Sequence, residues 1–239
     1  MNECDNEDPR PVDPHSGVPL GRRPQPGYYP TFSTLAQQQY WDATTRSVIL
    51  DRVHQVPSAH FFDAEQTHVL AAICARVLPQ DDRDEAHRIP IVPHIDRRLA
   101  AGENDGYRYE DMPPDPEAYL LALRALDESA QAVFERTFLA ATLSQQDELL
   151  RSLHDGKPLC DHAAWRLMPV KRFWTLLLSD CVDAYYSHPY AWDEIGFGGP
   201  AYPRAYMRLA NGEPETWEVE EVRYAWAAPP WSSSAEPSA

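Results

Sequence analysis

Apolar residues recur every three or four positions along most of the middle of this sequence, which is the spacing of one face of an α-helix. The pattern is clearest over residues 63–78, 92–100, 115–127, 130–143, 144–156 and 169–186. Strands do not alternate with helices anywhere, and the one strand-like piece is 216–226. We therefore predict an all-α fold, an irregular compact helical bundle with long loops and a short extended C-terminal arm.

Local signals mark several helix ends. Asp63 is a good N-cap, because Gln66 follows at the capping-box position. A helix over 115–127 has proline and acidic residues in its first turn, which suit the start of a helix. A separate helix is expected over 130–143, and Ser144 is expected to cap the one after it.

The segment 169–186 is predicted to be the longest helix, with Asp180 on its apolar face. A buried carboxylate must be paired or hydrogen-bonded, because burying an isolated charge is costly. The candidate partners are Arg97, Arg98 and Arg204, and we expect a structural ion pair.

Composition divides the chain into three parts. Residues 1–30 are rich in proline and acidic residues and almost free of aliphatic ones, so we expect a disordered tail. Residues 31–210 are predicted to form a single helical domain. Residues 211–239 are predicted to be a C-terminal arm and tail.

The charge balance excludes some partners. With 37 acidic and 21 basic residues the formal net charge is −16, which argues against a nucleic-acid partner and against binding to anionic lipid. No apolar run is long enough for direct membrane insertion. Arg22 and Arg23 precede prolines rather than the apolar stretch of an export signal, so we expect a cytoplasmic chain, periplasmic if co-exported with a partner.

The cysteines are Cys4, Cys74, Cys160 and Cys181, and no two have the close spacing of a structural zinc site. Cys74 and Cys181 fall within apolar helical patterns, so we expect buried thiols. Cys160 follows a loop. The spacing leaves the disulfide state of Cys74, Cys160 and Cys181 undecided.

The sequence carries no glycine-rich dinucleotide motif, phosphate-binding loop or nucleophile elbow. Glu65 and His68 have the spacing of a ferritin-like di-iron site, and Asp51 and His54 echo it loosely. The helix dipole already explains an acid such as Glu65 in the first turn of a helix. His68 shares its helix face with Arg76, which is expected to point to solvent, so this face is not expected to line a buried metal site. We therefore expect no catalytic, cofactor-binding or metal-binding residues in this chain.

Aromatic residues between Tyr185 and Tyr206 are mixed with glycines and prolines, which interrupt regular structure. Long loops of this kind are usually functional. Packing within the loop, contact with a partner and stacking on a sugar all remain open for its aromatic residues. The predicted partner-interface residues are Tyr186, Tyr190, Trp192, Ile195, Phe197, Gly198, Gly199, Tyr202, Pro203 and Tyr206.

The same segment resembles the gluconate 2-dehydrogenase subunit 3 family. The motifs that carry the resemblance are His188-Pro189, Trp192, Ile195-Gly196 and Gly198-Gly199-Pro200 with Tyr202-Pro203. Upstream matches are Phe61-Phe62, the helix end at Val77-Leu78-Pro79-Gln80-Asp81, Ile89-Pro90 and His94-Ile95-Asp96. Together they cover roughly Phe61 to Leu209, whereas the C-terminal arm lies beyond the match.

The resemblance implies a non-catalytic small subunit of a heteromeric dehydrogenase. Its partner would be a large flavoprotein subunit of the glucose–methanol–choline type, which holds FAD and oxidises a sugar or sugar acid. A cytochrome c subunit often takes the electrons in such complexes, and the small subunit stabilises the flavoprotein and helps to export it. The alternatives are a stand-alone helical binding or stress protein and a di-iron oxidase.

Overall fold

The computed structural model describes residues 33–81, 83–104, 106, 109–195, 197, 199 and 200, together with two short strands. Its helices are α1 (Ala43–His54), α2 (Ala64–Val77), α3 (Ile91–Ala100), α4 (Asp115–Phe134), α5 (Leu143–His154), α6 (Ala164–Leu167), α7 (Val170–Tyr186) and α8 (Pro189–Ile195). Two 3-10 helices, η1 (Leu35–Tyr40) and η2 (Glu85–His87), precede α1 and α3. The predicted all-α class is confirmed.

Two strands of two residues each, β1 (Pro11–Val12) and β2 (Ala225–Trp226), pair antiparallel, with Pro11 opposite Trp226. β2 falls at the end of the segment predicted to be extended. The rest of that segment lies outside the described residues.

The chain divides into two compact units, where the sequence had predicted one helical domain over 31–210. The larger unit is Val53–His188, and the smaller one combines Met1–Arg52 with Pro189–Ala239. The predicted boundaries near residues 30 and 210 lie outside the described residues and stay predictions.

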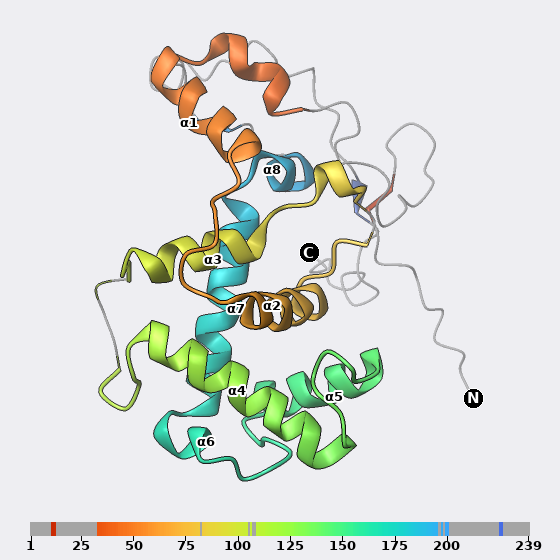
Figure 1. Cartoon of the computed structure of the whole chain (residues 1–239). Helices are drawn as coiled ribbons and strands as arrows, with labels where there is room; N and C mark the ends of the chain where they lie inside the picture. The colour runs from red at the N-terminus through yellow and green to blue at the C-terminus, as the bar shows by residue number, and fades with distance from the viewer. Residues whose placement is uncertain are drawn as a thin grey trace, which may run out of the picture. The chain divides into compact units, whose positions relative to one another are not determined.

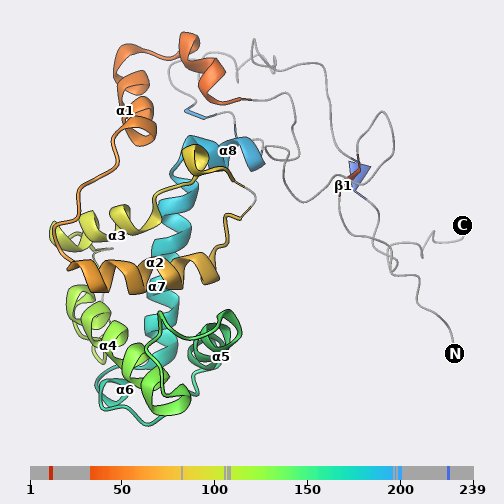
Figure 2. The ribbon, with the colours of Figure 1, turned by 45° about the vertical axis from the view of Figure 1, so that its right-hand side comes forward.

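The larger unit is built around α7, which contacts α2, α3, α4 and α5 (Figures 1 and 2). Its apolar stripe meets the apolar stripes of these four helices, so that one core lies between them. The largest fully buried side chains of this core are Leu70, Ile73, Ile95, Tyr119, Leu126, Phe138, Leu149, Leu153, Met168, Phe173, Leu177 and Tyr185. No helix in the described part of the chain is long and apolar enough to cross a membrane.

Capping boxes begin α2 and α5. At α2 the expected box is confirmed, because Asp63 Oδ1 accepts from Gln66 N (2.8 Å) and Gln66 Oε1 accepts from Asp63 N (3.1 Å). At α5 the prediction of Ser144 was wrong, and Thr142 is the cap. Gln145 stands three residues after Thr142 and accepts from its backbone N–H (2.9 Å), which completes the reciprocal pair.

The predicted break near Asp127 was wrong, because α4 is continuous over 20 residues. Ser129 does not interrupt it, since its hydroxyl donates to the Ala125 carbonyl within the helix. The helix ends at Phe134, and its C-cap residue Glu135 has a left-handed φ of 57°. Asp127 Oδ1 then accepts from Phe138 N (2.7 Å), which folds the following turn back onto α4.

This turn replaces the helix expected over 130–143. Phe138 is fully buried, whereas Val133 and Leu139 are exposed. α4 is therefore the longest of the described helices, and α7 has 17 residues.

Pro189 does not lead into a loop. α7 ends at Tyr186 as expected, but Pro189 opens α8, which runs to Ile195. Proline is unfavourable in a helix interior and favourable in the first turn, where no intrahelical partner for its nitrogen is needed. Seven residues of the predicted aromatic loop, Pro189–Ile195, are therefore helical.

Candidate functional site

In the smaller unit, α8 and the segment after it are hydrogen-bonded to Thr34, which precedes η1. Thr34 N donates to Asp193 Oδ1 (2.7 Å), and the Thr34 hydroxyl donates to the Phe197 carbonyl (3.2 Å). Gly199 has a φ of +77°, and a Cβ on it would lie 2.9 Å from Thr34 Cγ2. Glycine is needed at this position both for its left-handed backbone and for the close approach.

Trp192 lies inside the smaller unit. Its side chain is 6% exposed and packs with Trp41 and Ile49. The ring of Phe197 meets it edge-on, with centroids 5.4 Å apart, and Arg52 Cζ lies 5.7 Å from the centre of the Trp192 ring. The sequence left packing within the chain, contact with a partner and stacking on a sugar open for the aromatic residues of this segment. For Trp192 the structure shows packing within the chain.

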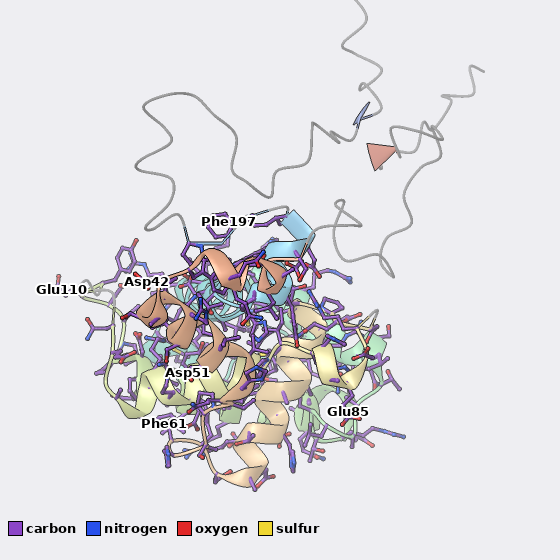
Figure 3. The ribbon with its side chains drawn as sticks, turned by 90° about the horizontal axis from the view of Figure 1, so that it is seen from above. Asp42, Asp51, Phe61, Glu85, Glu110 and Phe197 are labelled. Atoms are coloured by element: carbon purple, nitrogen blue, oxygen red, sulfur yellow. The ribbon has the colours of Figure 1, made fainter. Side chains whose placement is uncertain are left out.

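Other predicted interface residues are accessible. Ile195 and Phe197 are 53% and 47% exposed, and Tyr190 is half-buried. Phe197, which is labelled in Figure 3, stands two residues after the end of α8. Gly198, Tyr202, Pro203 and Tyr206 fall outside the described residues, so their predicted roles stay predictions.

The larger unit has its own accessible apolar surface on α7. Leu178, Val182 and Tyr186 are each between 36% and 42% exposed. They are spaced by four residues, so they lie in a row on one side of the helix. We call this row the α7 face.

The sequence had singled out Tyr186 alone of the three residues in the α7 face. Leu178 and Val182 each directly follow a buried residue, Leu177 and Cys181. The sequence signal that could have identified Leu178 and Val182 is an apolar stripe on α7 that is wider than burial in the core requires.

Asp180 has the cationic partner that its position required. Only 8% exposed, it accepts from Arg98 Nη2 (2.6 Å) and from the Tyr119 hydroxyl (2.6 Å). Arg98 also donates to Asp115 Oδ2 (2.7 Å). The predicted ion pair is confirmed with Arg98, whereas Arg97 is exposed. These four side chains connect α3, α4 and α7.

Burial and charge shift the pKa values in this network. Burial raises the pKa of Asp180 above its usual value, although Tyr119 and Arg98 oppose the change. Burial and the negative charge of Asp180 raise the pKa of Tyr119 well above its ordinary value. For Arg98 burial acts to lower the pKa, but the hydrogen bond to Asp115 and the charge of Asp180 outweigh it and raise the pKa.

A second buried carboxylate holds the chain that enters α2. Asp96, on α3, is 1% exposed and accepts backbone N–H bonds from His60 (2.6 Å), Phe61 (3.1 Å) and Phe62 (2.9 Å). Three donors on one carboxylate satisfy its charge. The motifs Phe61-Phe62 and His94-Ile95-Asp96, far apart in sequence, are therefore one structural unit.

The di-iron spacing does not form a site. Glu65 and His68 are exposed on α2, and Asp51 and His54 are exposed on α1, whereas such a site requires all its ligands to face one bundle interior. In the described part of the chain, no group of three or more His, Cys, Asp or Glu side chains is arranged to hold a metal ion.

The described residues form a helical scaffold in which the buried Asp180 is paired with Arg98. Apolar side chains are exposed on α7, at the end of α8 and just after α8. The chain matches the family model described as gluconate 2-dehydrogenase subunit 3 over residues 64–199, more than half of its 239 residues. It belongs to this family. The match runs from the first residue of α2 to beyond α8. No curated protein and no solved structure matches the chain.

Proposed function

We propose that this chain is a non-catalytic small subunit that binds and stabilises a flavin dehydrogenase of the glucose–methanol–choline type. The partner would bind FAD and oxidise a sugar or sugar acid, and a cytochrome c subunit would accept the electrons. Membership of the gluconate 2-dehydrogenase subunit 3 family supports this role.

The observation that carries the proposal is the α7 face. Leu178, Val182 and Tyr186 leave apolar surface in water, and burying such surface is worth about 25 cal/mol per Å². Rows of exposed apolar residues on soluble proteins commonly mark contact with other proteins. Ile195 and Phe197 supply a second accessible apolar pair in the smaller unit.

The paired charges support the same role. Arg98 and Asp180 connect α3 to α7 on the side opposite solvent, and Asp96 fixes the chain before α2. A surface on a helix that is already fixed loses little conformational freedom when it is covered. We infer that the network maintains the α7 face in its binding conformation.

The test is co-expression with the tagged flavoprotein subunit of the same complex. The variant Leu178→Ala with Val182→Ala and Tyr186→Ala should weaken pairing about 100-fold, from about 1 kcal/mol for each side chain. The matched control is Leu139→Ala with Leu143→Ala, two exposed leucines at the turn before α5 and at its start. The control should pair normally, and both variants should keep the melting temperature of the isolated chain.

Full pairing of the triple variant together with loss in the control would show that the contact lies elsewhere. If the flavoprotein neither co-purifies with the unaltered chain nor gains thermal stability from it, the chain is a stand-alone binding protein instead. FAD absorbance should follow the flavoprotein after the two subunits are separated. FAD retained by this chain alone would contradict the proposed division of roles.

A further inference from the structure

Two cysteines far apart in the sequence meet inside the larger unit. Cys74 on α2 and Cys181 on α7 are 107 positions apart, and their Sγ atoms are 3.7 Å apart. Both are free thiols and both are buried. The sequence predicted their burial, but it could not show that the two sulfurs face each other.

We propose that Cys74 and Cys181 form an intramolecular disulfide when the chain meets a small disulfide oxidant such as oxidised glutathione. The bond would join α2 to α7, the helix that carries the α7 face. This inference does not depend on the proposed function, because it rests on the contact of the two sulfurs alone.

A shallow pocket gives the oxidant a route to one of the two thiols. The pocket, of about 300 Å³, lies against the C-terminal half of α2 and the start of α3, and Cys74 is part of its lining. Cys181 is not part of that lining and is fully buried. Cys74 is therefore the entry thiol, and Cys181 is the resolving thiol behind it.

The reaction is an ordinary thiol–disulfide exchange in two steps. The Cys74 thiolate attacks oxidised glutathione, forms a mixed disulfide and releases one glutathione thiolate. The Cys181 thiolate then attacks the Cys74 sulfur and releases the second glutathione. The two protein thiols lose two protons and two electrons, and oxidised glutathione takes up both electrons as it becomes two molecules of reduced glutathione.

The environment makes this reaction slow in the folded chain. The hydrogen bond with Cys181 and burial raise the pKa of Cys74 well above its ordinary value, and the charge of Asp180 acts in the same direction. Because the thiolate is the attacking species, few molecules react at any moment at neutral pH. Refolding in a glutathione buffer, before the helices close over the thiols, should give the same bond faster.

The experiment uses the full chain, either refolded or incubated folded in oxidised glutathione, with free thiols then blocked. Intact mass should show two fewer blocking groups than on the fully reduced chain, and peptide mapping should join the peptides that contain Cys74 and Cys181. Since the bond closes a long loop, the melting temperature should rise by about 10 °C. The control Cys160→Ala should still form the bond.

Two further variants, incubated in oxidised glutathione only after folding, test the order of attack. Cys181→Ala should accumulate a mixed disulfide of glutathione on Cys74, because the resolving thiol is gone. Cys74→Ala should accumulate neither product at Cys181. Absence of the cross-link in the refolded unaltered chain, or a cross-link that uses Cys160 instead, would overturn the proposal. Glutathione on Cys181 of the Cys74→Ala variant would overturn the assignment of the entry thiol.

Discussion

Replacing Asp180 by alanine should destabilise the larger unit strongly. The change leaves Arg98 Nη2 and the Tyr119 hydroxyl without their acceptor, in a site where Asp180 is 8% exposed. Breaking a buried ion pair by removing one partner typically costs about 3–5 kcal/mol. The low end of this range applies for two reasons. Arg98 keeps Asp115 as a partner when Asp180 is removed. Burial also raises the pKa of Asp180 despite the nearby Arg98, so the cost of desolvating Asp180 already offsets much of its attraction to Arg98.

The expected loss is therefore about 3 kcal/mol, or about 10 °C in melting temperature for a unit of this size. Urea unfolding followed by circular dichroism measures it. Asp183→Ala, an exposed aspartate one turn later on α7, is the matched control and should change stability by less than about 0.5 kcal/mol. Equal, small losses for both variants would refute the idea that the buried network fixes α7.

Three further predictions concern other parts of the chain. Trp192→Ala should lower the melting temperature of the isolated chain, because Trp192 is buried. Phe197→Ala should leave that melting temperature nearly unchanged and weaken pairing with the flavoprotein, because Phe197 is exposed. Equal melting temperatures for the two variants would contradict this. Gly199→Ala should destabilise the chain by about 1 kcal/mol or more, measured by urea unfolding, because its φ is +77° and the added methyl group meets a neighbouring side chain. The hydrogen bond from Arg76 lowers the pKa of Asp147 below 3.8, so this pair stabilises the fold above that pH and the effect disappears as pH falls through the lowered value. Asp147→Asn should thus be less stable than the unaltered chain at neutral pH by under about 1 kcal/mol, with no difference at the acid end of a urea–pH series.

The features that local chemistry controls were predictable from the sequence. The reciprocal hydrogen bonds of Asp63 and Gln66 join residues only three positions apart, so the start of α2 was predicted correctly. Asp180 could be expected to have a cationic partner because a carboxylate on an apolar helix face must be neutralised, and Arg98 was among three candidates. The family motifs were also readable in order along the chain.

Contacts between distant segments decided the rest. α4 continues past Asp127 because that carboxylate is occupied by the Phe138 backbone, a contact that no spacing in the sequence reveals. Trp192 looked like a partner anchor, but Trp41 and Ile49 on a segment more than a hundred residues away cover it.

Burial depends on which segments meet, and a helical pattern specifies a face without specifying its neighbour. The sequence by itself therefore determined the helical class, the capped start of α2 and the need to pair Asp180. Only the tertiary structure decided that Leu178, Val182 and Tyr186 stay in water and that the thiols of Cys74 and Cys181 meet, because both outcomes depend on how α7 packs against its neighbouring helices.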